Sequence, residues 1–371
     1  MYPSNMYPRN MQSSKDIAQL KQLNDLLHQC IGGRSGIVTI AGPVGSGKTR
    51  LMNEFAGLAP ASGALFLGAV GSRSEQPVPF GVIHQVIHDA TRSSPSETQF
   101  RDLLELASSL TASTNGSHDR TAQMRATQQI GHALLDLGST TPLVIGVDDI
   151  HHADRESLHC LGYIARRLRP ARMLIVLSEA MRAQAATLEA YRDLLRCSHV
   201  RRIHLTLLTP AEVHDLLASR GGDQAAEALV DGCWRLTGGN PVLVDALLQD
   251  SVGPSGDGSA LNALVPGEAF REAVIACLQR CEPTILPMAR AAAVLGDDAT
   301  PDLICRLADL SVANPAARLS PTTTGGLLDR GCLRAPTVAR VVLDEMNANE
   351  LADLHRRAAE LLHRDGALPH A

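Results

Sequence analysis

The sequence contains little lysine and few aromatic residues. Only three of its 34 basic residues are lysines, namely Lys15, Lys21 and Lys48, and aromatic residues make up 3% of the chain. Acidic residues outnumber basic ones, and the resulting net charge of −5 excludes an overall positive field that would hold nucleic acid. Because aromatic residues are scarce, any core must be built from Leu, Val, Ile and Ala.

Long apolar runs and paired cysteines are also missing. No stretch approaches the roughly 18 uncharged apolar residues of a membrane helix, so we expect no membrane span. The eight cysteines form no Cys-x-x-Cys pair, which argues against a disulfide framework or a thiolate zinc site and favours a reducing, cytoplasmic location. Cys277 and Cys281 share a predicted helix face and are expected to be small core residues.

What is present is the composition of a globular protein, with 44% hydrophobic and 20% charged residues. At roughly 100–200 residues per domain, a chain of 371 residues is expected to form two or three domains. Residues 1–13 are polar, repeat a short motif and lack an apolar segment, so we expect a disordered tail there.

Predicted strands and helices alternate along the first half of the chain. Apolar segments predict buried strands at residues 37–41, 64–69, 143–147, 173–177 and 203–207. Helical spacing of apolar residues predicts helices at residues 13–30, 80–90, 98–111, 120–137, 154–168 and 186–196. This alternation is typical of a parallel sheet with helices on both faces. We therefore expect an α/β domain over residues 14–208.

The second half is predicted to be mostly helical. Thr209, Pro210 and Glu212 combine an N-cap, a first-turn proline and the acid of a capping box, which predicts a helix start. Helices are expected at residues 210–219 and 223–236, up to 249, and at 267–280, 283–295, 301–309, 324–330 and 349–363. Gly, Ser and Pro residues predict a linker at residues 251–266, between a helical segment at 209–250 and a small helical domain at 267–371.

The sequence around Lys48 has the pattern of a phosphate-binding loop, or Walker A motif, between a predicted strand and a predicted helix. Its glycines let backbone N–H groups turn toward phosphates, and the helix N-terminus adds its dipole. We expect Lys48 to reach the β- and γ-phosphates as a catalytic group and the Thr49 hydroxyl to bind Mg²⁺. The candidate nucleotide-binding residues of this segment are Gly42, Pro43, Val44, Gly45, Ser46, Gly47, Lys48, Thr49 and Arg50.

A second motif, of the Walker B type, follows about 100 residues later. It is an apolar strand at residues 143–147 that ends in Asp148 and Asp149. Asp148 is expected to hold Mg²⁺ through water, and Asp149 to orient or deprotonate an attacking water molecule. A strand followed by acidic residues is common by itself, but together with the phosphate loop it predicts an ATP site.

Two other polar clusters have simpler interpretations. His84 and His88 are spaced like zinc ligands on a helix but lack the glutamate of a metalloprotease motif, so we interpret them as helix-face histidines. Arg166, Arg167 and Arg169 end a predicted helix, where an arginine finger acting in trans is one interpretation. The favoured one is that these cations complement the helix C-terminus.

Taken together, the motifs resemble a known family. The order of the phosphate loop, residues 148–154 (Asp-Asp-Ile-His-His-Ala-Asp), the helix after them and Gly239-Asn240-Pro241 is similar to that of the signal-transduction ATPases with numerous domains (STAND). It is more similar still to the N-terminal ATPase region of large ATP-binding LuxR-type transcriptional regulators of actinobacteria, relatives of the maltose regulator MalT. Residues 354–362 resemble a helix that follows the winged-helix region in that family.

The resemblance implies a P-loop NTPase fold of the AAA+/STAND type. This fold is an α/β domain with a parallel sheet and helices on both faces, followed by a helical lid at residues 209–250 and a small winged-helix-like domain at 267–371. The resemblance also implies an ATP/ADP switch that uses Mg²⁺ and self-associates when ATP is bound. In the family the proline of the Gly-Asn-Pro motif packs on the adenine, so the same role is expected for Pro241.

Three positions depart from the family pattern. Ser14-Lys15-Asp16 lies near the place of the usual Gly-Arg-Glu, and the Thr/Arg sensor of the fourth strand is replaced by Ser178 with a late Arg182. Ala335 takes the place of a histidine that could lock ADP in the winged-helix domain. We therefore expect ADP to be held more loosely than in relatives.

The sequence thus predicts an ATP/ADP-binding regulatory switch of a bacterial transcriptional regulator, with slow hydrolysis. A role in secondary metabolism, such as antibiotic biosynthesis, follows only from the resemblance. Residues 267–371 carry a net charge of −3, from eleven arginines and fourteen acids, so DNA is expected to be bound only by another domain or a partner protein. The chain is then either a fragment of a longer regulator or a separate ATPase half. The alternatives are a stand-alone AAA+-like remodelling ATPase and a nucleotide-binding interaction scaffold.

Overall fold

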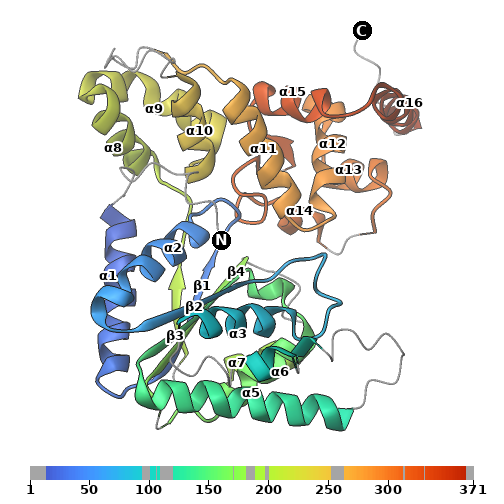
Figure 1. Cartoon of the computed structure of the whole chain (residues 1–371). Helices are drawn as coiled ribbons and strands as arrows, with labels where there is room; N and C mark the ends of the chain where they lie inside the picture. Colours follow the sequence, from blue (N-terminus) through green and yellow to red (C-terminus); the bar gives the residue numbers. More distant parts are fainter. Residues whose placement is uncertain are drawn as a thin grey trace. The chain divides into compact units, whose positions relative to one another are not determined.

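The computed structural model describes most of the chain. The described residues are 14–93, 101–105, 107–108, 120–169, 171–180, 189–196, 200–251, 263–311, 314–329 and 331–364. They form two compact units, which Figure 1 shows in colours that follow the sequence. The α/β unit comprises Ser14–Ala41 and Lys48–Leu205, and the C-terminal unit comprises Gly42–Gly47 and Thr206–Ala371. A short segment from the first half of the sequence therefore belongs to the compact unit of the second half.

The α/β unit is built around a five-stranded parallel sheet with the order β2-β3-β4-β1-β5. Its strands are β1 (Gly36–Gly42), β2 (Leu65–Val70), β3 (Leu143–Asp148), β4 (Met173–Ala180) and β5 (Val200–His204). Because parallel strands end at the same edge, the end of β1 and the end of β3 lie on one side of the sheet. The strand β1 leads into the phosphate loop there, and β3 ends in Asp148.

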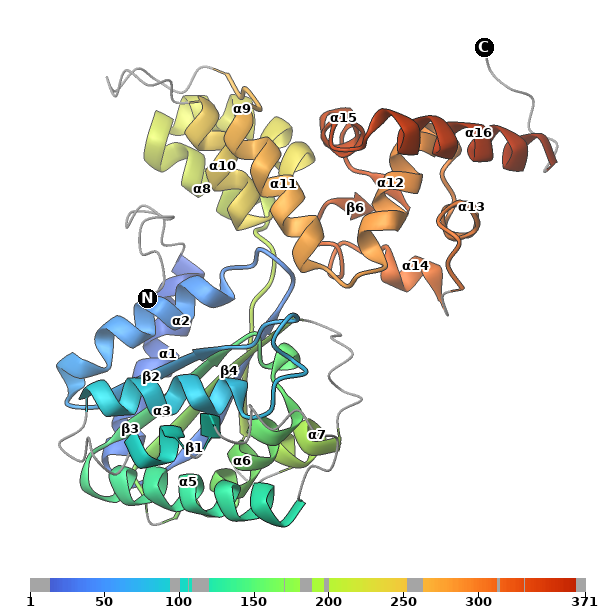
Figure 2. The same ribbon diagram turned by 45° about the vertical axis from the view of Figure 1, so that its right-hand side comes forward.

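Helices cover both faces of this sheet (Figure 2). One face packs against α1 (Ser14–Ile31) and α2 (Lys48–Leu58). The other face packs against α3 (Gly81–Ser93), α5 (Arg120–Thr140), α6 (Arg155–Ala165) and α7 (Glu189–Leu195). Along β3, Val144 belongs to the first core while Leu143 and Ile145 belong to the second, as the alternation of side chains on a strand requires. The predicted parallel sheet with helices on both faces is confirmed.

Four predicted strands overlap the observed ones closely, but the fifth is displaced. We predicted it at residues 203–207, whereas β5 spans Val200–His204. This strand lies at the sheet edge and exposes Arg201 and Arg202, so it lacks the apolar run by which the other strands were recognised. The buried Leu205, one of the apolar residues on which the prediction was based, comes after the strand.

The C-terminal unit begins with the helices α8 (Pro210–Gly221), α9 (Asp223–Thr237) and α10 (Pro241–Ser251). The predicted capping box of α8 is confirmed, because Glu212 N donates to Thr209 Oγ1 at 3.3 Å and Thr209 N donates to Glu212 Oε2 at 2.8 Å. The division into a segment at residues 209–250, a linker and a small domain at 267–371 stays a prediction.

The remaining described residues of this unit form helices, turns and one short hairpin. Its helices are α11 (Glu268–Arg280), α12 (Ile285–Leu295), α13 (Pro301–Leu307), α14 (Pro315–Arg318), α15 (Pro336–Asp344) and α16 (Ala348–Arg364). The hairpin pairs β6 (Leu328–Asp329) with β7 (Cys332–Leu333) in antiparallel fashion. Residues from α8 to α16 share one hydrophobic core, to which the buried Cys277 and Cys281 also belong.

One predicted helix in this region is wrong. Residues 324–327 form turns and Leu328–Asp329 form β6, where we expected a helix at 324–330. Gly325 and Gly326 have φ angles of 62° and 84°, in the left-handed region that a continuing helix does not use. The helix α15, which begins at Pro336 directly after Ala335, was not predicted.

Some expectations fall on residues outside the described part of the chain. They are the tail at residues 1–13, residues 98–100, 106 and 109–111 of the helix at 98–111, residues 186–188 of the helix at 186–196, Arg182 and residues 252–262 of the linker. Among the described residues, none of the helices combines enough length with enough apolar character to cross a bilayer.

Candidate functional site

The phosphate loop, residues 42–49, connects β1 to α2. Gly45 and Gly47 have φ angles of 77° and 93°, a backbone conformation that favours glycine. The Oγ atom of Ser46 is buried and has no hydrogen-bond partner among the described residues. Lys48 is the first residue of α2 and is only 8% exposed. Glycines in these conformations, followed by a helix N-terminus, form an arrangement that suits a bound anion.

Thr49 on α2 lies next to Asp148 at the end of β3. Thr49 Oγ1 donates a hydrogen bond to Asp148 Oδ2 at 2.7 Å. Asp148 is 5% exposed, so its carboxylate is largely shielded from solvent. A hydroxyl and a carboxylate in contact are oxygen ligands of the kind that Mg²⁺ prefers, and the two residues predicted to hold this ion are therefore neighbours.

Ser178, near the end of β4, holds the two acids of the Walker B motif. Its hydroxyl donates to Asp148 Oδ1 and accepts a hydrogen bond from Asp149 N at 2.9 Å. Asp149 has φ and ψ angles of 48° and 47°, a left-handed conformation that is uncommon for a residue other than glycine. Gly71 leaves room for this turn, because a Cβ at that position would lie 2.4 Å from Asp149 O. The backbone that carries Asp149 is thus tightly defined.

Two histidines follow the acids in a short 3-10 turn, Ile150–His152. The ring centroids of His151 and His152 are 4.0 Å apart, and Arg73 Nε donates to His152 Nε2 at 3.2 Å. Burial, together with the nearby His152, Lys48 and Arg73, lowers the pKa of His151 to about 3, against the opposing effect of Asp148. Its Nδ1 atom is buried and unpartnered among the described residues. His151 is therefore a neutral imidazole beside the acidic turn.

The neutral state of His151 predicts a pH-dependent stability. Between pH 6.5 and about 3 the unfolded chain binds a proton at this residue and the folded chain does not, so stability is lost as pH falls through that window. His151 changes the free energy of unfolding by at most about 1.4 kcal/mol per pH unit. When the free energy of unfolding is measured by urea titration from pH 7 to pH 4, His151→Asn should make it depend less steeply on pH. The same substitution at the exposed His28 is the control, and an equal effect of both variants would contradict the prediction.

Asp154 anchors the starts of two helices in the α/β unit. It caps α6 by accepting a hydrogen bond from Ser157 N at 2.8 Å, and it accepts two more from Phe80 N at 2.8 Å and Val82 N at 3.2 Å. The residue is 2% exposed, and Ser157 Oγ accepts from Ile83 N at 3.0 Å beside it. These contacts tie the start of α3 to the segment that follows Asp149.

Two other predicted nucleotide-binding residues have clear positions. Arg50 on α2 forms ion pairs with Asp16 on α1 and with Glu54 at 3.4 Å. The guanidinium thus contacts the Ser14-Lys15-Asp16 segment that departs from the family pattern. Pro241 is the first residue of α10, and its side chain is partly exposed.

The arginines that end α6 have contacts of their own. The guanidinium carbon of Arg167 lies 3.9 Å from the ring centroid of Tyr163, which favours a cation–π contact. Arg166 is the C-cap of α6, where a cation complements the helix dipole. Both observations agree with the structural interpretation of this cluster.

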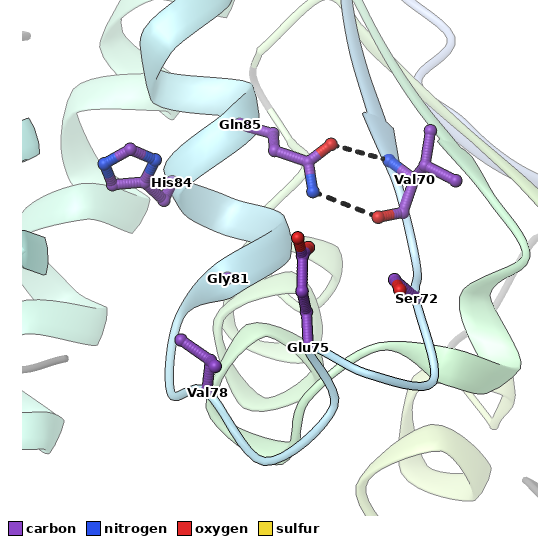
Figure 3. A pocket seen from close by; sticks show the side chains of 7 residues that line it. All are labelled: Val70, Ser72, Glu75, Val78, Gly81, His84 and Gln85. Atoms are coloured by element: carbon purple, nitrogen blue, oxygen red, sulfur yellow. Dashed lines mark hydrogen bonds between the residues drawn. The ribbon is translucent and has the colours of Figure 1, made fainter.

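A separate cavity of about 560 Å³ lies beside the edge strand β2 (Figure 3). It is lined by Val70, Ser72, Glu75, Val78, Gly81, His84 and Gln85. Gln85 on α3 contacts both backbone groups of Val70, since Nε2 donates to Val70 O and Oε1 accepts from Val70 N, each at 3.0 Å. These bonds cover part of the open edge of the sheet. The described lining contains no lysine or arginine.

Sequence reasoning missed several residues that organise the site. It assigned no role in the acidic turn to Ser178 or His151, and it singled out Pro241 but not the preceding Asn240. Each of these residues lies in or beside a motif that the sequence shows. Their contact partners, however, lie in distant segments, as Ser178 and Asp148 do at a separation of 30 positions.

The comparisons with known proteins agree with this geometry. Residues 18–177 match the family model of the AAA ATPase domain. Together with the sheet order, the phosphate loop and the acidic turn, this match identifies the fold as that of the P-loop AAA+ NTPases. Among curated proteins, none is similar enough in sequence to count as a match.

Three solved structures illustrate what this chain is similar to. A STAND protein with a tetratricopeptide repeat sensor from Pyrococcus horikoshii is 17% identical over 93% of this chain and 45% of its own, with a TM-score of 0.39. This chain thus spans less than half of that protein. Cdc6p from Pyrobaculum aerophilum is 14% identical over 98% and 97% of the two chains, with a TM-score of 0.46. The Orc1 protein of Aeropyrum pernix, solved in complex with DNA, is 14% identical over 92% and 94%, also with a TM-score of 0.46.

Proposed function

We propose that this chain is an ATP/ADP-binding switch module of a bacterial transcriptional regulator. The AAA ATPase match covers most of the α/β part of the sequence, and proteins of this class bind nucleotide with Mg²⁺ and self-associate. In the proposal, the bound nucleotide sets the state of the module, and the ATP form self-associates. The role in regulating transcription, and in secondary metabolism in particular, is supported by the resemblance to the LuxR-type regulators.

The observation that carries the nucleotide proposal is the contact between Thr49 and Asp148 beside Lys48. The hydroxyl and carboxylate are 2.7 Å apart, next to a lysine at the head of α2. In the proposal Lys48 holds the β- and γ-phosphates, and the backbone amides of residues 42–47 surround them. Thr49 and Asp148 hold Mg²⁺, the latter through water. The ion would neutralise charge on the phosphates when bound.

Hydrolysis in this proposal is slow. Asp149 orients or deprotonates the attacking water, and its backbone position is held by Ser178. An arginine finger is worth about 10³–10⁵ in rate, and the sequence motifs indicate none that acts in cis. Slow turnover suits a switch, because the ATP state then persists long enough to be recognised.

DNA contact is assigned to another domain or to a partner protein. Residues 267–371 have a net charge of −3, and among the described pairs several of their arginines are bound to carboxylates, including Arg271 with Glu268 and Arg290 with Glu350. A surface that binds DNA through its phosphates needs unpaired cations. The winged-helix-like region is therefore proposed as a regulatory domain.

The test compares the wild-type protein with Asp149→Asn. The variant should bind ATP as tightly as the wild type, because Asp149 is not assigned to phosphate or Mg²⁺, while its hydrolysis should fall about 10²- to 10⁴-fold. Light scattering with ATP and with ADP should show larger particles only with ATP, and the variant should keep the larger form for longer. Calorimetry measures binding, and phosphate release measures turnover.

Two outcomes would favour the alternative functions. Fast ATP turnover by the isolated wild-type protein would indicate a remodelling ATPase. Nucleotide binding with neither hydrolysis nor a change in particle size would indicate a nucleotide-binding interaction scaffold.

A further inference from the structure

Part of the phosphate loop is packed into the C-terminal unit. The segment Gly42–Gly47 clusters with Thr206–Ala371, and the side chain of Val44, 8% exposed, belongs to the hydrophobic core that contains Leu208 and Leu243. A loop that only joins a strand to a helix has no need of such contacts. The conformation of the loop therefore depends on residues far along the chain.

Asn240 is the polar centre of this packing. It is fully buried, and its Nδ2 atom donates to Val44 O at 3.1 Å and to Gly325 O at 2.7 Å. Its Oδ1 atom accepts from Val242 N at 3.0 Å and so caps α10. Both amide hydrogens are used on carbonyl groups, and this fixes the orientation of the carboxamide, since the flipped amide would place its oxygen against two carbonyl oxygens.

Glycines allow the three segments to meet at Asn240. A Cβ on Gly45 would lie 2.3 Å from Asn240 Oδ1, and one on Gly325 would lie 2.7 Å from Val44 O. The segment before α10 and the turn before β6 also meet directly, because a Cβ on Gly238 would lie 2.3 Å from Gly326 O. The loop, the segment before α10 and the turn before β6 are thus in backbone contact, with no room for side chains.

The bond from Asn240 also sets the direction of an amide in the loop. Because a peptide unit is planar and trans, the N–H of Gly45 points opposite to the C=O of Val44, and therefore away from Asn240. Phosphate loops bind anions through such backbone amides. A turned peptide at this position would present a carbonyl oxygen in place of an N–H.

We propose that Asn240 is a positioning residue of the phosphate loop, which orients the Val44–Gly45 peptide for phosphate and couples the loop to the turn at Gly325. This inference rests on the proposed nucleotide-binding function and adds a route by which the nucleotide state reaches the C-terminal unit. A phosphate that draws the Gly45 amide toward itself shifts the Val44 carbonyl, and Asn240 passes this shift to the Gly325 carbonyl. The turn that contains Gly325 precedes the β6–β7 hairpin.

The test uses the full chain with Asn240→Asp at pH 8. Aspartate keeps the size of the side chain and the acceptor for Val242 N, but it sets oxygen against the carbonyls of Val44 and Gly325. ATP binding should weaken about 10- to 100-fold. Without nucleotide, hydrogen exchange should become faster both in residues 42–47 and in residues 324–329. Asn240→Ser, which keeps a cap oxygen but does not span both carbonyls, is the second variant if the first does not fold.

The matched control is Thr324→Val. The Thr324 hydroxyl contacts Ser320 O and Leu328 within the same turn and makes no bond to the loop. This variant should accelerate exchange in residues 324–329 and leave residues 42–47 unchanged.

Two results would overturn the inference. One is wild-type ATP affinity in Asn240→Asp when Lys48→Ala has lost it. The other is faster exchange confined to residues 324–329, because a purely local role of Asn240 predicts that pattern. If the wild-type protein binds no nucleotide, the proposed function fails, while the exchange experiment still decides whether Asn240 couples the two segments.

Discussion

Replacing Lys48 with alanine is expected to weaken ATP binding about 10²- to 10⁴-fold. The ammonium group would make charge-assisted hydrogen bonds to the β- and γ-phosphates, and each is worth about 1.5–3 kcal/mol. The residue is 8% exposed at the start of α2, so little water is available to replace it. ADP has no γ-phosphate, and its affinity should fall less than that of ATP. Calorimetric titration of both nucleotides measures the two losses.

Two control variants make this result specific. Lys48→Arg keeps the charge, but its planar guanidinium is broader than an ammonium, so it should also bind ATP poorly. Lys21→Ala removes an exposed lysine from α1 and should bind ATP like the wild type. Circular dichroism should show the same helix content in all variants. Unchanged ATP affinity in Lys48→Ala would falsify the assignment of the phosphate loop.

The sheet and the two nucleotide motifs were predictable because their signals are local. The strands β1 and β3 are buried along most of their length, so each reads as an apolar run. The loop pattern and the acids Asp148 and Asp149 then follow directly at the strand ends. Parallel pairing brings such ends to the same edge of the sheet, so the contact between Thr49 and Asp148 needed no further information.

The remaining features depend on contacts between distant segments. Asn240 and Val44 are separated by 196 positions, and nothing in the sequence near either residue shows that the carboxamide of Asn240 donates to the backbone carbonyl of Val44. The exposed arginines of the edge strand β5 interrupt the apolar run by which a buried strand is recognised. The turn at Gly325 is followed by the buried Leu327 and Leu328, and these apolar residues led to the prediction of a helix. Burial that is decided by tertiary packing leaves a weak pattern in the sequence.

Replacing Asp154 with alanine is expected to destabilise the α/β unit by about 4 kcal/mol or more. The carboxylate accepts from three buried backbone amides, those of Phe80, Val82 and Ser157. Alanine leaves all three without an acceptor, at about 1–3 kcal/mol each. Since domains are stable by only about 5–15 kcal/mol, the variant should lie near the limit of folding. Urea unfolding followed by circular dichroism measures the loss.

A graded series separates the network from a simple helix cap. Asp154→Asn keeps Oδ1 for Phe80 N and Ser157 N and gives up only the bond from Val82 N, so its loss should be smaller than that of alanine. Ser157→Ala removes the hydroxyl that accepts from Ile83 N and should cost about 1–2 kcal/mol. A helix cap alone predicts a loss of only about 1 kcal/mol for Asp154→Ala. A loss that small would mean that the amides of Phe80 and Val82 find other partners, and that Asp154 does not hold α3 to the acidic turn.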